Sequence, residues 1–116
     1  LEAFSAEELQ AHMAVNVAAP AFLTSAFAEM GGEGDRLVIN ILDAKLAAPN
    51  PDFLSYTLSK AALAELTILS AQALAGRGIR VNGIAPALML LSEGQTESNF
   101  AAMHRFNPLA RGVTPD

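Results

Sequence analysis

The chain has 116 residues, of which 52 % are hydrophobic and 16 % charged, and its formal net charge is −5. A composition this apolar excludes a disordered chain, and the negative charge excludes a surface built for nucleic acid or anionic lipid, which needs clustered Lys and Arg. There is no cysteine, so the chain has no disulfide framework and no thiolate metal site, which suits a reducing cytoplasm. We expect no signal peptide and no membrane helix, because no apolar run approaches the roughly 20 residues of a membrane span.

The first predicted element is a helix over residues 6–30. Ser5 and Glu8 form a capping-box pattern that marks its start. Pro20 is expected to interrupt its hydrogen bonding and to kink it, and the Gly-rich segment 31–35 ends it. Because the chain opens on this cap without an initiator Met, we expect it to be a piece of a longer protein.

Two apolar strands and a second long helix follow. The runs at 36–42 and 79–84 do not alternate with polar residues, which indicates strands covered on both faces, as in a parallel sheet. A helix is predicted between them at 52–75, and the glycines in 76–78 stop it. Residues 87–110 are expected to be a substrate-binding loop region with a short helix near 95–105.

This order predicts an α/β fold. A strand, a helix and a strand in succession give parallel neighbours. Because two strands make an incomplete sheet, residues 1–116 are interpreted as a single partial Rossmann-like domain, one half of a doubly wound parallel sheet.

Four polar residues are predicted to converge at one edge of that sheet. Asp43 follows the carboxyl end of the first strand, where ligands bind in open α/β sheets. Tyr56 and Lys60 are four residues apart and share one face of the second helix. Asn16 is a polar amide inside the first helix. Each of them singly has an ordinary interpretation, as a solvated helix pair, a turn-forming acid or a polar spot on a helix flank.

Their combination resembles the short-chain dehydrogenase/reductase family over about residues 7–112. Residues 14–17 (AVNV) match the family's helix asparagine, and residues 56–63 (YTLSKAAL) match its YxxxK signature. Residues 79–86 (IRVNGIAP) match the strand that leads to its substrate loop, and residues 108–111 (PLAR) resemble the segment after that loop. The resemblance implies a Rossmann fold, a nicotinamide cofactor and oxidoreductase activity.

Two positions depart from the family pattern. The family has a catalytic serine thirteen residues before the tyrosine, where this chain has Asp43, and it has glycine after the proline at position 86, where this chain has alanine. Pteridine reductases share the Asp-Ala pair seen at 43–44 and a leucine-rich run like 88–92 (LMLLS). Met89 stands where they have a small polar residue. The chain resembles this subfamily most.

The resemblance also implies roles for these residues. Tyr56 is the proton donor, and Lys60 lowers its pKa from the usual ~10 and binds the nicotinamide ribose. Asn16 holds a water that connects Lys60 to solvent. Cofactor contacts are implied for Asn16, Tyr56, Lys60, Pro86, Leu88 and Met89, and substrate contacts for Asp43, Tyr56, Leu88 and Leu91.

Asp43 changes the expected chemistry. An ionised carboxylate cannot donate a hydrogen bond to a ketone oxygen, and it raises the pKa of Tyr56 against the effect of Lys60. It suits a C=N substrate with its own N–H donors, such as a pterin, either as a carboxylate acceptor or as an acid that shares a proton with Tyr56. The alternative is that the serine was lost and the enzyme is weak or inactive.

Other features carry weaker predictions. His12 and His104 are isolated, and we expect exposed helix residues and not metal ligands. An apolar pocket lining, or equally core or interface, is predicted for Phe53, Leu54, Leu88, Met89, Leu91, Phe100, Met103 and Phe106.

The Gly-rich turn that receives a cofactor pyrophosphate does not occur in these 116 residues. NADP(H) is therefore expected over NAD(H) by analogy with pteridine reductases alone. The resemblance implies a homodimer or homotetramer through the two long helices, with a small-molecule substrate and neither nucleic acid nor membrane as partner.

Three functions remain open at this point. They are an NADP(H)-dependent reductase of pterin-like substrates, a short-chain dehydrogenase that acts on another carbonyl or alcohol, and a catalytically silent cofactor-binding protein that keeps the fold.

Overall fold

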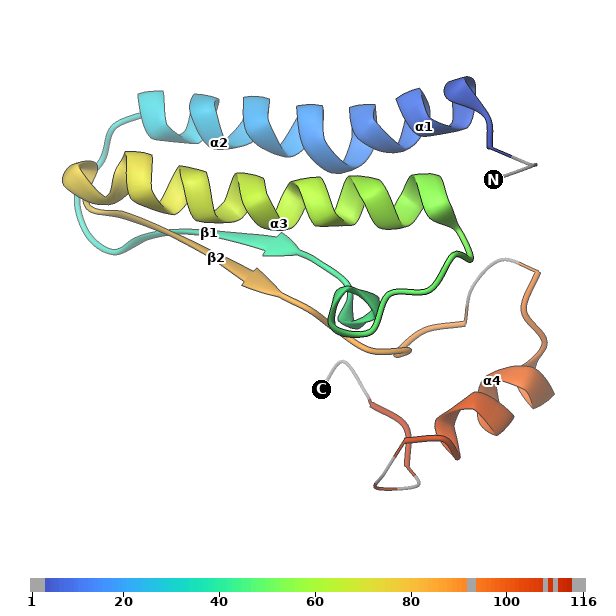
Figure 1. Ribbon diagram of the computed structural model, residues 1–116. Coiled ribbons are helices and arrows are strands. Elements are labelled where there is room, and N and C mark those ends of the chain that lie inside the picture. The colour runs from blue at the N-terminus through green and yellow to red at the C-terminus, as the bar shows by residue number, and fades with distance from the viewer. Residues whose placement is uncertain (1–3, 92–93, 108, 110, 114–116) are drawn as a thin grey trace. The chain divides into compact units, whose positions relative to one another are not determined.

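The computed structural model of the chain describes residues 4–91, 94–107, 109 and 111–113. The chain forms two compact units, one before and one after the peptide bond between residues 85 and 86, and each is described by itself. The first unit contains helices α1, α2 and α3 and strands β1 and β2, and the second contains helix α4 (Figure 1). The predicted order of helix, strand, helix and strand is confirmed.

The predicted first helix forms as one rod with an irregular turn in its middle. Its parts are α1 (Ala6–Met13), a π-helical segment (Ala14–Ala18) and α2 (Ala19–Glu29). The Ser5 hydroxyl accepts a hydrogen bond from the Glu8 N–H at 3.3 Å, which confirms the predicted cap. The Glu8 carboxylate does not complete the capping box, because it lies 3.7 Å from the His12 ring instead.

The irregular turn lies before Pro20 and not at it. Proline has no N–H, so Pro20 cannot serve the carbonyl of Asn16 four residues earlier. The Ala19 N–H reaches back five residues to the Ala14 carbonyl, which is the widened π pattern. The disturbance therefore falls on the turn that carries Asn16.

The two strands pair in parallel, with α3 as the connection between them. β1 (Arg36–Ile41) and β2 (Ile79–Ile84) run in register, from Arg36 opposite Ile79 to Ile41 opposite Ile84. α3 spans Leu54–Leu74, and Gly78 ends the following turn in the left-handed conformation (φ 67°), which glycine adopts freely. These bounds agree with the predicted ones.

The helices of this unit cover one face of the sheet (Figure 1). A small core forms there from Ala28, Ile79 and Val81, with Val38 and Phe27 packed against it. The other face carries exposed apolar side chains, Leu37, Ile39 and Ile41. The prediction that both faces of the first strand are covered is therefore wrong within the described unit, because its helices all pack on the Val38 face.

Judged by length and apolar composition alone, the stretch Ala6–Glu29 could span a membrane, in contrast to our expectation. One such helix is weak evidence for a membrane, since core helices of soluble proteins meet the same criteria.

The second unit contains α4, which spans Glu97–His104 within the predicted range. The Thr96 hydroxyl caps it by accepting from the Asn99 N–H at 3.2 Å. The segments 88–92 and 108–111 were compared with the family in the sequence. Their residues 92, 108 and 110 lie outside the described residues.

Candidate active site

The predicted acid and tyrosine meet directly. Asp43 follows β1 with an extended backbone, and its Oδ1 accepts from the Lys45 N–H at 2.7 Å, which caps a short 3₁₀ turn (Ala44–Ala47). Its Oδ2 accepts from the Tyr56 hydroxyl, also at 2.7 Å. One carboxylate oxygen thus accepts a hydrogen bond from its own loop, and the other accepts one from the phenol hydroxyl.

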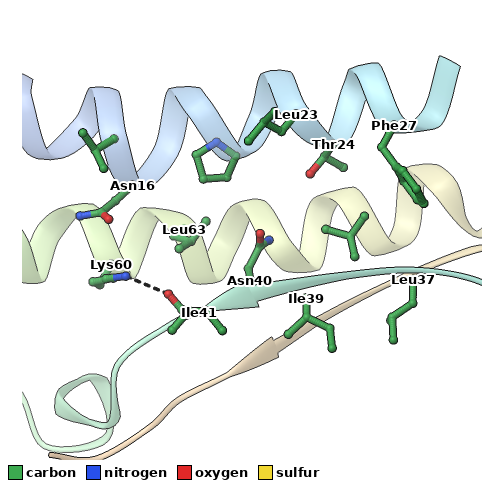
Figure 2. Close-up of a pocket in the computed structure, with 13 residues that line it drawn as sticks. Asn16, Leu23, Thr24, Phe27, Leu37, Ile39, Asn40, Ile41, Lys60 and Leu63 are labelled. Atoms are coloured by element: carbon green, nitrogen blue, oxygen red, sulfur yellow. Dashed lines mark hydrogen bonds between the residues drawn. The ribbon is translucent and has the colours of Figure 1, made fainter. Parts of the chain in front are cut away.

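Lys60 lies one helical turn after Tyr56 on α3, as predicted. Its ammonium nitrogen is 5.7 Å from the centroid of the Tyr56 ring. The same nitrogen donates to the Ile41 carbonyl at 2.8 Å (Figure 2). Ile41 is the last residue of β1, so the lysine connects the helix to the carboxyl end of the strand. The convergence of Asp43, Tyr56 and Lys60 at this edge agrees with the prediction.

The pKa of Tyr56 is raised well above its ordinary value. Burial is the main cause, and the hydrogen bond and negative charge of Asp43 add to it. We predicted that Asp43 raises the pKa of Tyr56 and that Lys60 lowers it. The net change is an increase, as predicted from Asp43. The pKa of Lys60 is lowered, because burial disfavours its charged form more than Asp43 favours it. The resting site keeps the phenol protonated.

Asn16 joins the site through a residue that the sequence did not single out. Its Nδ2 donates to the Ser59 hydroxyl at 2.9 Å, and Ser59 donates in turn to the Tyr56 carbonyl at 2.7 Å. Asn16 and Lys60 also line a common cavity of about 450 Å³ between α2, α3 and β1 (Figure 2). The available signal for Ser59 was its helical position, three residues after Tyr56 on the buried face of α3.

His12 is the second residue that sequence reasoning missed. It was expected to be an exposed helix residue, but it is half-buried and its ring meets the Tyr56 ring edge-on at 5.7 Å between centroids. The contact arises because α1 packs against the first turns of α3 (Figure 1). A contact between two helices leaves no pattern in either sequence segment.

The loop before α3 carries a strained backbone. Phe53 is in the left-handed conformation (φ 53°), which a bulky residue rarely adopts, and its ring is exposed. The Lys45 ammonium lies 5.3 Å from the centroid of that ring and donates to the Asp52 carbonyl. The predicted place of Phe53 in a pocket lining stays a prediction, because Phe53 lines neither described cavity.

The predicted loop residues form contacts within the second unit. The Leu88 carbonyl lies 3.0 Å from the His104 Nε2, and the His104 ring stacks edge-on against Phe100, so His104 is also half-buried and not exposed as expected. A cavity of about 320 Å³ is lined by Ala87, Leu88, Met103, His104, Asn107 and Val113. The cofactor and substrate contacts assigned to Pro86, Leu88, Met89 and Leu91 stay predictions, because they belong to this unit.

Among the residues that the structure describes, no group of three His, Cys, Asp or Glu side chains could hold a metal ion. The donors at the sheet edge are instead a phenol, an ammonium and an amide. These groups suit proton transfer and the binding of hydroxyl groups.

A parallel sheet carries an acid at its carboxyl edge and a Tyr–Lys pair on the next helix, the arrangement that the sequence resemblance predicted. The chain belongs to the short-chain dehydrogenase/reductase family: the family model described as enoyl-(acyl carrier protein) reductase matches residues 1–116. Two relatives are similar over 67 % of the chain. They are dehydrogenase/reductase SDR family member 4 from Homo sapiens, at 42 % identity, and pteridine reductase 1 from Leishmania tarentolae, at 35 %.

The fold is also similar to a solved structure. FolM alternative dihydrofolate reductase 1 from Brucella canis, complexed with NADP, superposes with a TM-score of 0.90 and 40 % identity over 97 % of this chain. The chain spans 45 % of that structure's length and 28 % and 29 % of the lengths of the human and Leishmania relatives. The predicted Rossmann-type fold and the predicted family are confirmed.

Proposed function

We propose that the protein carrying this chain is an NADP(H)-dependent reductase of a pterin-like C=N bond. The observation that carries the proposal is the 2.7 Å hydrogen bond from the Tyr56 hydroxyl to the Asp43 carboxylate. A carboxylate in this place accepts hydrogen bonds and cannot donate one to a ketone oxygen. The likeness to a pteridine reductase and to a dihydrofolate reductase complexed with NADP supports the same substrate class.

The residues at the carboxyl end of β1 fit a nicotinamide cofactor. Lys60 donates one of its three ammonium protons to the Ile41 carbonyl, which leaves two for the paired hydroxyls of a ribose. Asn16 lines the same cavity and supplies amide groups beside it. When bound, the cofactor supplies a hydride.

Reduction of a C=N bond places that hydride on carbon and a proton on nitrogen. Tyr56 is the donor of the proton, and its raised pKa keeps the phenol protonated near neutral pH. Asp43 accepts a hydrogen bond from an N–H of the substrate ring and so orients the ring. The charge of Lys60 favours the phenolate that remains after the transfer.

The test is NADPH oxidation by the full-length protein with a dihydropterin or dihydrofolate. Tyr56→Phe removes the proton donor and should lower kcat by roughly 10²–10⁴-fold, the usual contribution of general acid catalysis. Glu65→Gln, an exposed change on the same helix, is the matched control and should leave kcat unchanged. A Tyr56→Phe variant with full pterin turnover would contradict the proposal.

A second candidate is a reductase or dehydrogenase of another carbonyl or alcohol. The 42 % identity with dehydrogenase/reductase SDR family member 4 favours it. Turnover of ketones together with none of pterins would select this candidate. Tight NADPH binding without turnover across both substrate panels would instead identify a silent cofactor-binding protein.

We further propose a homodimer or homotetramer through the two long helices. Exposed apolar side chains on them support this assembly: Phe22, Ile68 and Leu69. Light scattering of the full-length protein measures the mass. A monomer at micromolar concentration would contradict this assembly without affecting the proposed reaction.

A further inference from the structure

Ser59 is the most buried polar residue of the site, with an exposed fraction of 0 %. Its hydroxyl donates to the Tyr56 carbonyl at 2.7 Å and accepts from the Asn16 amide at 2.9 Å. A buried hydroxyl that both donates and accepts a hydrogen bond is held in place, because breaking either bond leaves a buried polar group unpaired. Ser59 therefore ties the helix that carries Asn16 to the helix turn that carries Tyr56.

The direction of these two bonds orients the Asn16 amide. A serine hydroxyl has one proton, and here it points to the Tyr56 carbonyl. Ser59 can then only accept from Asn16, so the amide nitrogen and not the amide oxygen must face it. The Asn16 Oδ1 is left as the acceptor for the cavity that Asn16 and Lys60 share.

The backbone around Asn16 is irregular. Asn16 lies in the π-helical segment, and Pro20 cannot donate to its carbonyl. Single π turns inside α-helices are rare and are frequent at functional sites. Among the described residues, Ser59 is the hydrogen-bond partner of the Asn16 side chain.

We propose that Ser59 is a positioning residue of the active site, which holds the Asn16 amide in one orientation towards Lys60 and fixes the turn that presents Tyr56. The role rests on the proposed function, since it acts through the proton donor and the lysine assigned there. Ser59 itself touches neither substrate nor cofactor in this role.

A double-mutant cycle in the full-length protein tests the proposal. The variants are Ser59→Ala, Asn16→Ala and the double variant, read out as kcat for NADPH oxidation and its pH profile. Each single change should lower kcat by roughly three- to tenfold, the range that one hydrogen bond is worth. Because both act through one bond, the double variant should lose little more than either single variant.

Two further variants separate positioning from stability. Ser55→Ala is the matched control, since Ser55 is also buried on α3, one turn earlier, and it should leave kcat within twofold. Ser59→Cys keeps a weak donor and acceptor, so its kcat should lie between those of the wild-type protein and the Ser59→Ala variant. Additive losses in the cycle, or a lower melting temperature with unchanged kcat and pH profile, would overturn the positioning role.

Failure of the proposed function gives a different result. A wild-type protein that binds NADPH without turnover rejects the reductase, and the same cycle is then read in the Kd for NADPH, where coupled losses support the positioning role and additive or absent losses overturn it. A wild-type protein without NADPH binding overturns both proposals.

Discussion

Asp43 and Tyr56 are thirteen residues apart in the sequence and 2.7 Å apart in the structure. Their pairing was predictable, because the end of a strand and the start of the next helix meet at one sheet edge. An ionised carboxylate at position 43 accepts hydrogen bonds where the serine of the family donates one, so in that form Asp43 does not stabilise an alkoxide. The Asp43 carboxylate also raises the pKa of the Tyr56 phenol, and this effect can be measured.

Tyr56 is the single tyrosine among these residues and there is no tryptophan, so its ionisation has a clean near-ultraviolet signal. Asp43→Asn removes the negative charge but keeps an oxygen acceptor. The pKa of Tyr56 should fall towards the ordinary ~10 yet stay above it, because burial is the larger cause of the shift and remains. The measurement is an absorbance titration, with Tyr56→Phe subtracted to remove any other tyrosine of the full-length protein.

The same shift sets the direction of the alkaline stability change. Because the folded-state pKa of Tyr56 is raised, its contribution is complete below the unfolded pKa of ~10 and is lost as pH rises through the folded value. Asp43→Asn should make this contribution smaller, whereas Asp35→Asn, at an exposed pair with Arg80, is the control and should not. An unchanged Tyr56 titration in Asp43→Asn would show that the charge has no part in the shift.

At the scale of elements, the sequence predicted the α-helices and strands of the first unit but neither the π turn nor the 3₁₀ turn at Ala44–Ala47. Pro20 was correctly taken as a disturbance, yet its effect appears four residues earlier, at the carbonyl that the proline cannot serve. That residue is Asn16. The partner of Asn16 could not be predicted, because Ser59 lies 43 residues later and a contact between helices depends on how they pack.

Pro20→Ala tests whether the irregular turn serves the site. Alanine restores an N–H for the Asn16 carbonyl, so the helix should become regular and gain about 1–2 kcal/mol of unfolding free energy, less than the ~3 kcal/mol of an interior proline, because the π turn already relieves part of the cost. The regular turn should rotate Asn16 away from Ser59 and lower kcat. Thermal unfolding and steady-state kinetics measure the two effects.

Pro49→Ala is the matched control for this change, since Pro49 is an exposed loop proline and its replacement should alter neither quantity much. A Pro20→Ala protein that is more stable and equally active would show that the π turn has no part in the reaction.

At the scale of the molecule, the composition and the structure differ in an informative way. Hydrophobic residues make up 52 % of the chain, yet the described part buries few of them: Ala28, Leu63, Ile79 and Val81. The apolar face of Leu37, Ile39 and Ile41 is exposed where the sequence predicted cover. The apolar pattern of a strand shows which of its faces can be buried, but it does not show what buries them. The chain spans 45 % of the length of the solved structure it resembles.

The 116-residue chain expressed by itself should therefore expose an apolar surface that promotes self-association. The exposed face of β1 presents three large apolar side chains in one row, and contiguous apolar surface of this kind promotes association. The isolated chain should bind a hydrophobic dye and scatter light as an oligomer at micromolar concentration. Ile39→Lys should reduce both signals, because it places a charge in the middle of the row, whereas Glu65→Lys, an exposed change on α3, adds charge without touching that face and should have little effect. A monomeric chain that unfolds cooperatively and binds no dye would show that the exposed face is not a surface for association.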